Sequence, residues 1–286
     1  MVRLQDFNTN ETFEGKVLSI EPITPDDASE EVYEIKLEID QDDFSYELGQ
    51  SVALLVPGPH EFGNEYHMRL YTIADGGKSE NGKPAITVCV KRCFFIDEVS
   101  GDRFPGVASN YFCDRSPGDT VLLAGPYPSP FAMPPEDTAN ILMVGLGTGI
   151  APFRAFIRHI YDVHGGWKGK VRLFHGAKTG LDMLYMNDKN NDLTHYYDQE
   201  TFKAFEAVSP RPAFDAPIAL DKAIEENAEE VWNMMRDPDT YVYVAGHAKV
   251  AELLDQAGAR IAGSEDKWER RKTELKAGGR WAELVY

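Results

Sequence analysis

The sequence predicts a two-domain protein, an antiparallel β-barrel followed by a doubly wound α/β domain with a parallel sheet. Before residue 130, short apolar runs separated by Gly, Pro and Asp have a spacing typical of a small barrel or sandwich. A proline-rich join over 126–135 then divides the chain. After the join, strand-like and helix-like segments alternate, which indicates parallel strands with crossovers. We place the domains at 1–134 and 135–286.

Each element has its own signal. Residues 32–39 alternate apolar and polar side chains, as a half-buried strand does, and further strands are expected at 51–56, 69–74, 86–92 and 120–124. In the second domain, buried strands are expected at 140–144, 171–175 and 241–246. Helices are expected at 152–164, 221–235 and 248–261.

Composition and charge exclude several classes of protein. The net charge of -18 opposes binding to the phosphates of nucleic acids. No apolar run approaches the roughly 20 residues that span a bilayer, and the N-terminus lacks the apolar segment of a secretion signal. We therefore expect a cytoplasmic protein without membrane insertion. The first 50 residues hold fourteen acids and three bases, which favours a solvated face over a docking surface.

The cysteines and histidines indicate no metal site. Three cysteines, Cys89, Cys93 and Cys113, suggest no disulfide framework and are too few for the four thiolates that usually hold an iron–sulfur cluster. The histidines show no ligand spacing with paired acids. Any one-electron iron chemistry is therefore expected on another protein.

A glycine-rich turn joins the first strand of the second domain to its first helix. Gly145, Gly147 and Gly149 would let the backbone approach a ligand, and the helix N-terminus behind them presents free N–H groups to an anion. Pro152 suits the first helical turn. The spacing departs from Gly-x-Gly-x-x-Gly, and a simple strand-to-helix turn would also use these residues.

Two segments of the first domain and the chain end offer further binding chemistry. Arg69 and Tyr71 point to one face of a strand, where a guanidinium suits a diphosphate and a ring suits stacking. Residues 106–110 open a short helix that adds N–H groups and the Ser109 hydroxyl. Each segment also fits ordinary barrel structure. The end, 281–286, is either an edge strand or a strand whose terminal Tyr286 packs on a flat cofactor.

In their order along the chain, these segments resemble those of plant-type ferredoxin–NADP(H) reductases. The matching pieces are Arg-Leu-Tyr-Thr (69–72), Cys-Val-Lys-Arg (89–92), Gly-Val-Ala-Ser-Asn (106–110), Gly-Thr-Gly-Ile-Ala-Pro-Phe-Arg (147–154), Phe-His-Gly-Ala-Lys-Thr (174–179), Leu-Tyr (184–185), Ala-Val-Ser (207–209), Tyr-Val-Tyr-Val-Ala-Gly (241–246) and Val-Tyr (285–286).

The resemblance implies an FAD-binding barrel followed by a nicotinamide-nucleotide domain. Arg69 and Ser109 would hold the FAD diphosphate, Tyr71 and Tyr286 would stack on the two faces of the isoalloxazine, and Phe95 would lie against the adenine. The other cofactor-binding positions that it implies are Leu70, Thr72, Cys89, Val90, Lys91, Gly106, Val107, Ala108, Gly147, Thr148, Gly149, Pro152, Ser209, Arg211 and Gly246.

Three departures from the family pattern surround the expected site of hydride transfer. The family commonly has Ser where Thr72 stands, Cys where Ala245 stands, and Glu where Leu284 stands. Glu283 lies one place earlier, on the opposite face of a strand. With Tyr286, the positions Thr72, Ala245 and Glu283 mark the expected catalytic region. We expect these changes to alter nicotinamide placement and rate rather than abolish the chemistry, because the flavin carries it.

The choice of nucleotide depends on a loop after residue 208. Ser209 and Arg211 lie near the position where the family grips the 2′-phosphate of NADP, although a plain loop pair would look the same. The family's Lys-x-Tyr-x-Gln aligns with Pro217, Ala219 and Asp221, and an Asp there would repel a phosphate or accept from a ribose hydroxyl. We favour NADP(H) slightly over NAD(H).

The expected function is FAD-dependent electron transfer between NADP(H) and a one-electron carrier such as ferredoxin or flavodoxin, by hydride transfer at flavin N5. The alternatives are an NADH-dependent reductase component of an oxygenase system and a flavin electron-relay subunit that has lost nicotinamide chemistry. The acidity of the chain leaves two options for docking. Either the partner is not an ordinary acidic ferredoxin, or a local basic patch forms from Lys91, Arg92, Arg103, Arg115, Arg154 and Arg158.

Overall fold

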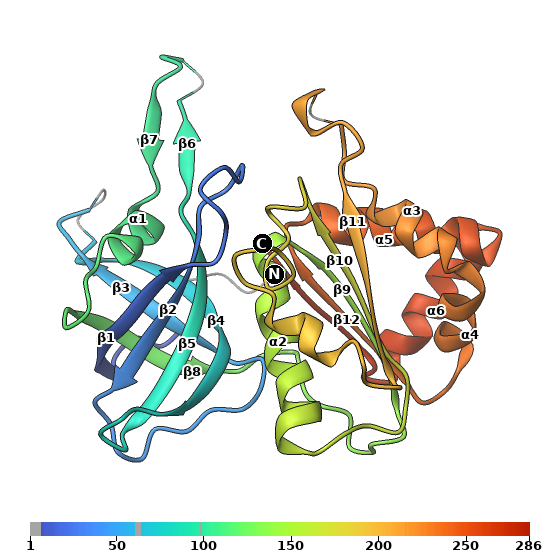
Figure 1. Ribbon diagram of the computed structural model, residues 1–286, viewed down its shortest axis with the longest axis horizontal. Coiled ribbons are helices and arrows are strands. Elements are labelled where there is room, and N and C mark those ends of the chain that lie inside the picture. Colours follow the sequence, from blue (N-terminus) through green and yellow to red (C-terminus); the bar gives the residue numbers. More distant parts are fainter. Residues whose placement is uncertain (1–6, 61–63, 98, 215) are drawn as a thin grey trace. The chain divides into compact units, whose positions relative to one another are not determined.

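The computed structural model describes residues 7–60, 64–97, 99–214 and 216–286. The chain divides into two compact units (Figure 1). The first comprises Met1–Ile23 and Glu30–Ser129, and the second Thr24–Ser29 and Pro130–Tyr286. The chain therefore passes between the units inside the proline-rich join, and twice more at the two ends of the short segment 24–29. No helix in the described part of the chain has the length and apolar character needed to cross a bilayer.

The first unit is a closed antiparallel barrel, which confirms the predicted fold class for this half. Its strands follow the order β1-β2-β5-β4-β3-β8. Their bounds are β1 Thr12–Pro22, β2 Val32–Ile39, β3 Ser51–Pro57, β4 Tyr66–Lys78, β5 Pro84–Lys91 and β8 Thr120–Tyr127. β1 was not predicted, because Gly and charged residues interrupt its alternation. It nevertheless buries every second residue at Phe13, Gly15 and Val17.

One end of the barrel carries a short helix and a hairpin. Helix α1 (Val107–Cys113) packs against β3, β4 and β5, and its Phe112 is fully buried in the barrel core. The hairpin of β6 (Phe94–Ile96) and β7 (Arg103–Pro105) extends from the barrel just before α1 (Figure 1). Helix α1 thus contacts β4, the strand that carries Arg69 and Tyr71.

The second unit is a five-stranded parallel sheet in the order β11-β10-β9-β12-β13. The strands are β9 Asn140–Leu146, β10 Val171–Ala177, β11 Phe202–Val208, β12 Thr240–Gly246 and β13 Trp281–Val285. The chain thus winds outward in both directions from β9, which confirms the doubly wound prediction. The strand order reverses between β9 and β12, and ligands of such sheets bind at the carboxyl ends there.

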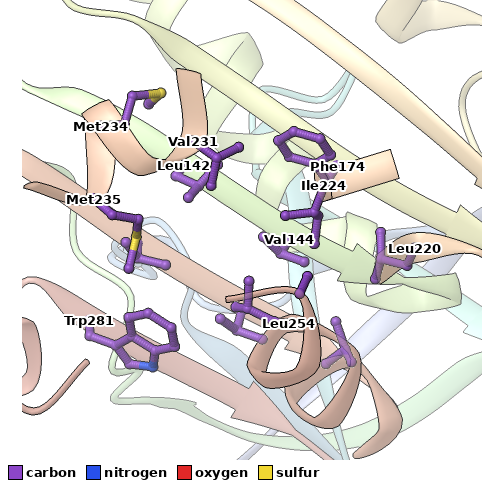
Figure 2. Packing of buried hydrophobic residues seen from close by; sticks show 14 of the residues in the cluster. Leu142, Val144, Phe174, Leu220, Ile224, Val231, Met234, Met235, Leu254 and Trp281 are labelled. Atoms are coloured by element: carbon purple, nitrogen blue, oxygen red, sulfur yellow. The ribbon is translucent and has the colours of Figure 1, made fainter. Parts of the chain in front are cut away.

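Helices cover both faces of this sheet (Figure 1). Helix α2 (Ile150–Arg158) covers one face and continues into a π-helical turn over His159–Val163. On the other face lie α3 (Leu220–Glu226), α4 (Ala228–Arg236), α5 (Lys249–Ala262) and α6 (Glu265–Ala277). Figure 2 shows how alternate strand residues, such as Leu142 and Val144, pack with residues of this second helical layer.

One sequence expectation for this unit needs correction, and two of its elements were not predicted. The single helix predicted over 221–235 is two helices, because Asn227 leaves the helical conformation and its side chain donates to the Ala223 carbonyl (2.9 Å). β11 was not predicted, although Phe202 and Ala207 are buried. Helix α6 was also missed, because only Trp268, Lys272 and Leu275 of its thirteen residues are buried.

The α5–α6 contact depends on a glycine and predicts a stability change. A Cβ added at Gly258 would lie 2.4 Å from the Trp268 ring, which itself packs edge-on against Trp281. We expect Gly258→Ala to lower the free energy of unfolding by about 1–3 kcal/mol, because the indole cannot retreat in a filled core. Urea unfolding followed by tryptophan fluorescence measures this. Gly180→Ala, where a Cβ meets open space, is the control, and equal losses for both variants would contradict the expectation.

Candidate functional site

Arg69 and Tyr71 lie in the part of β4 where the side chains change from buried to exposed. Ile73, Tyr71 and Arg69 share one face of the strand, and along it exposure rises from buried Ile73 to exposed Arg69. The Tyr71 ring meets the buried Phe112 of α1 edge-on, with ring centroids 5.4 Å apart. Burial raises the pKa of Tyr71 above its ordinary value, so the phenol stays neutral. The Arg69 guanidinium makes no hydrogen bond or ion pair with another described residue.

The opposite face of β4 has different contacts. Thr72 pairs with Ser51 on β3, and their hydroxyl oxygens lie 3.3 Å apart. Leu70 packs against a small apolar cluster that includes Leu55. These two predicted binding residues therefore support the strand with their side chains and would reach a ligand mainly through the backbone.

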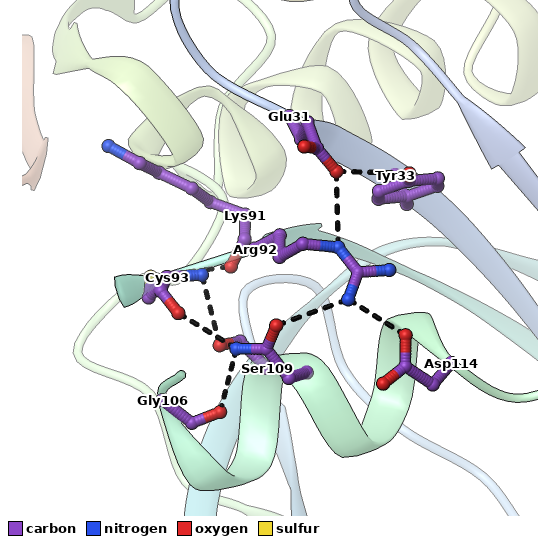
Figure 3. Close-up of polar contacts among 9 residues, drawn as sticks. Glu31, Tyr33, Lys91, Arg92, Cys93, Gly106, Ser109 and Asp114 are labelled. Carbon is purple, nitrogen blue, oxygen red and sulfur yellow. Dashed lines mark hydrogen bonds and ion pairs between the residues drawn. The ribbon is translucent and has the colours of Figure 1, made fainter. Parts of the chain in front are cut away.

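The end of β5 is anchored in the core and by ion pairs. The side chains of Cys89 and Val90 are buried. Lys91 pairs with Glu30. Arg92 forms ion pairs with Glu31 (3.1 Å) and Asp114 (2.8 Å), which fastens β5 to the start of β2 and the end of α1 (Figure 3).

A hydrogen-bond network joins β5 to the start of α1 (Figure 3). The N–H of Cys93 donates to Ser109 Oγ (3.1 Å), and the N–H of Gly106 donates to the Cys93 carbonyl (2.9 Å). Asn110 Nδ2 donates to the carbonyls of both Cys93 and Gly106. Ser109 is buried, and its hydroxyl retains a proton to donate. The first helical residues, Val107 and Ala108, therefore follow a loop that is fixed before any ligand arrives.

The hairpin after Cys93 presents aromatic rings to solvent. Phe95 is 56% exposed and stacks on Phe104, with centroids 5.4 Å apart and planes inclined by 22°. The Arg103 guanidinium lies 3.7 Å from the centroid of the Phe94 ring. Phe104 was missed from the sequence, because only the pairing of β6 with β7 brings it opposite Phe95. Exposed paired rings of this kind fit a flat heterocycle.

The glycine turn of the second unit lies at the switch point of the sheet. A Cβ on Gly149 would lie 2.3 Å from the Ala245 carbonyl oxygen, and one on Gly246 would lie 2.4 Å from the Leu146 carbonyl oxygen. These two glycines let the β9 turn and the β12 end touch. Gly147 differs, because it has a positive φ of 53° and faces open space. Pro152 lies in the first turn of α2, as predicted.

The chain end is held at the same place. The N–H of Tyr286 donates to the Gly246 carbonyl (3.1 Å), and the Tyr286 carbonyl accepts from the N–H of Ala248 (3.2 Å). The Tyr286 phenol is hydrogen-bonded to the Thr148 hydroxyl, while the residue is 66% exposed. The terminal ring therefore lies over the glycine turn. β13 is also the edge strand of the sheet.

The departures from the family pattern at Ala245 and Leu284 lie on two neighbouring strands of the sheet. Ala245 is buried on β12 and lies in register with Leu284 on β13. Glu283 shares a face with Trp281, accepts from its indole N–H (2.5 Å) and pairs with Lys276 (3.0 Å). Leu284 and Tyr286 share the opposite face. The carboxylate is therefore engaged with the α6 side of the sheet.

The loop after β11 contains the predicted nucleotide-selecting residues. Ser209 is buried, and its hydroxyl donates to the Ala216 carbonyl (2.5 Å). The N–H of Ser209 donates to the Lys178 carbonyl (3.2 Å), which ties this loop to the end of β10. Arg211 is exposed. Asp221, in the first turn of α3, pairs with Arg260 of α5 (2.7 Å).

The candidate basic patch is largely neutralised. Besides Lys91 and Arg92, buried Arg154 pairs with Asp192 (2.7 Å) and Arg158 pairs with Asp162 (3.4 Å). Arg103 and Arg115 instead lie over aromatic rings. Four of the six cations therefore have carboxylate partners within their own unit.

His175 is a buried residue that the sequence named only as part of a motif. It is fully buried on β10 beside Gly145 of β9, and neither ring nitrogen forms a well-shaped hydrogen bond with a described residue. Burial lowers the pKa of the imidazole to about 4, and a contact with the Gly145 backbone opposes this only weakly. The ring is therefore neutral at pH 7, beneath the glycine turn.

The fold and these sites define an oxidoreductase with a nucleotide-binding α/β domain, and comparison with known proteins agrees. The family of oxidoreductase NAD-binding domains matches residues 143–256. A ferredoxin–NADP reductase of Synechocystis is 31% identical over 279 residues, covering 95% of this chain and 67% of the relative. The chloroplastic enzyme of Spinacia oleracea is 30% identical, covering 100% of this chain and 78% of the relative.

The solved structures give the same fold. The ferredoxin–NADP+ reductase of Plasmodium falciparum superposes with a TM-score of 0.73 and 18% identity, covering 98% of each chain. The chain belongs to the ferredoxin–NADP reductase family, which confirms the family resemblance and the two-part fold.

The buried imidazole predicts a pH dependence of stability. Because the folded pKa of His175 is about 4, the unfolded chain binds a proton first as the pH falls through 6.5, and stability is lost between there and pH 4. We expect wild type to lose about 2 kcal/mol more than His175→Gln between pH 7 and 4.5. Urea unfolding at both pH values measures this. His164→Gln, at an exposed site, should behave as wild type, and identical pH profiles for all three proteins would refute the assignment.

Proposed function

We propose that the protein is an FAD-dependent oxidoreductase that transfers electrons between NADP(H) and a ferredoxin. The observation that carries the proposal is the 30–31% identity with ferredoxin–NADP reductases over at least 95% of this chain. The names of these relatives give the two proposed substrates, ferredoxin and NADP(H). The same site would serve a flavodoxin or an oxygenase component, and an acceptor assay distinguishes the three.

The barrel unit carries residues that fit FAD. Arg69 offers an exposed planar fork, and Ser109 offers a hydroxyl, so both suit a diphosphate. The Tyr71 ring, backed by Phe112, would lie against the isoalloxazine. The stacked pair of Phe95 and Phe104 would hold the adenine. Bound FAD would accept two electrons from a nicotinamide and release them one at a time.

The second unit carries residues that fit a nicotinamide nucleotide. Gly147 leaves open space at the carboxyl end of β9, and Thr148 and Tyr286 lie over the same turn. The Tyr286 ring would have to swing aside before a nicotinamide takes its place, and this movement would break its hydrogen bond with Thr148. Leu284, on the same face of β13 as Tyr286 and in register with buried Ala245, would line this place with apolar surface. Glu283 would stay with Lys276 and take no part in the reaction.

Ser209 and Arg211 support NADP(H) over NAD(H). Arg211 is the exposed cation of the loop after β11, and Ser209 shapes that loop through its bond to Ala216. An NADH-dependent enzyme would need a carboxylate free for the ribose hydroxyls. Asp221, the carboxylate expected there, is instead paired with Arg260.

The first test is the absorbance spectrum of the purified protein, followed by anaerobic titration with NADPH and with NADH. We expect a yellow protein that NADPH bleaches at lower concentration than NADH. The acceptor is then tested with ferredoxin, flavodoxin and an oxygenase component. A protein that takes up no FAD, or one that stays yellow with both nucleotides, would refute the proposal.

The second test concerns the diphosphate. We expect Arg69→Ala to weaken FAD binding about 10- to 100-fold, because charge-assisted bonds to phosphate contribute about 1.5–3 kcal/mol. Fluorescence quenching of FAD added to apoprotein measures the affinity. Lys78→Ala, an exposed cation at the far end of the same strand, is the control. Unchanged affinity in Arg69→Ala would remove this residue from the site.

The third test concerns the partner. Because the net charge is -18 and four of the six candidate cations are paired, we expect repulsion from an acidic ferredoxin. The rate of electron transfer to such a ferredoxin should therefore rise as salt screens the repulsion. Stopped-flow rates from about 20 to 300 mM salt measure this, with basic cytochrome c as the opposite-charge control. A rate that falls with salt for the acidic ferredoxin would instead indicate a local basic docking patch.

A further inference from the structure

Arg260 forms a charge cluster on the helical layer beside the loop after β11. Its Nε donates to Glu225 Oε1 (2.6 Å), and its NH2 donates to Asp221 Oδ2 (2.7 Å). Asp221 and Glu225 lie one turn apart on α3, so one guanidinium of α5 spans both carboxylates. The side chains of Asp221 and Glu225 are 19% and 33% exposed. The cluster is therefore partly screened by protein.

The position of this cluster relates it to the nucleotide loop. The N–H of Ala219 donates to the Val208 carbonyl (3.3 Å), at the end of β11 and next to Ser209. Asp221 follows Ala219 by two residues, which span at most about 7 Å. The Asp221 carboxylate thus lies beside the loop that carries Ser209 and Arg211, on the side where sheets of this type bind the adenosine ribose.

The charges decide what the loop can accept. A 2′-phosphate carries up to about two negative charges at neutral pH, and charges within about 8–10 Å interact in physiological salt. With Arg260 in place, the cluster holds one positive and two negative charges. Without Arg260, two uncompensated carboxylates would face the phosphate. NAD(H) has only a neutral hydroxyl at this position, so its affinity would change little when Arg260 is lost.

We infer that Arg260 is a specificity-determining residue, which allows a 2′-phosphorylated adenosine to bind beside Ser209 and Arg211 by neutralising Asp221. This inference rests on the proposed function and names the nucleotide class that the site takes. Arg260 acts through Asp221 and need not touch the nucleotide. Because ion pairs this exposed add little to stability, its loss should leave the fold intact.

The experiment compares KM and kcat for NADPH and NADH in wild type and Arg260→Gln. We expect Arg260→Gln to raise KM for NADPH about three- to tenfold, as two charges some 8 Å apart near a protein surface predict once screening by physiological salt is included. Both kcat values and KM for NADH should stay within about twofold. Arg260→Lys should retain most of the preference, because it keeps the charge. Arg270→Gln, which breaks the exposed pair with Glu274 on α6, is the matched control.

A second variant separates the charge effect from a structural one. Adding Asp221→Asn to Arg260→Gln should restore KM for NADPH toward the wild-type value, because the carboxylate that repels the phosphate is gone. If Arg260→Gln raises both KM values together, or if Asp221→Asn brings no recovery, Arg260 has a structural role and the inference is wrong.

A binding measurement keeps the inference independent of electron transfer. Calorimetry with 2′-phospho-AMP and with AMP should show that Arg260→Gln weakens only the phosphorylated ligand. A wild-type protein that binds these ligands equally would overturn the inference even if NADPH reduces the flavin. Conversely, selective weakening in a protein that neither nucleotide reduces would uphold the inference while the proposed function fails.

Discussion

The close approach of the β9 turn to the end of β12 is the constraint on which the second unit depends. Gly149 and Gly246 each lie against a carbonyl of the other segment, with no room for a Cβ on either. Gly147, in the same turn, differs because a Cβ there would meet open space. The backbone of Tyr286 is then fixed to the same β12 end through Gly246 and Ala248. One backbone contact thus positions the glycine turn, the end of β12 and the chain terminus together.

In the barrel unit, side-chain contacts instead of a backbone contact position the segments of the candidate site. Arg92 joins two strands and a helix, and the network of Cys93, Gly106, Ser109 and Asn110 sets the start of α1. Phe112 supports the Tyr71 ring from behind. The Tyr71 ring, which would contact FAD, is therefore supported by a residue that would not, whereas Ser109 both fixes the start of α1 and would contact FAD.

Much of the architecture could be predicted from the sequence, because strand periodicity and turn residues are local. All five predicted barrel strands exist, and so does the winding of the sheet. The strand β1 and the helix α6 were not predicted from the sequence, since their burial depends on partners far along the chain. The division of the predicted helix at Asn227 was not predicted either, because it depends on one side-chain hydrogen bond. Site residues divide in the same way. Motifs identified Arg69 and the glycine turn, but only pairing could reveal Phe104 opposite Phe95 or Arg260 beside Asp221.

The β6–β7 hairpin has a consequence for the life of the protein in the cell. Phe94, Phe95, Ile96 and Phe104 are all exposed on one narrow projection, together with Val99 at its tip. Exposed apolar surface of this kind promotes aggregation and recognition by chaperones and proteases. In a newly made chain these side chains would stay exposed to solvent until a ligand covers part of them. A ligand that covered these rings would therefore also protect the chain from aggregation and proteolysis.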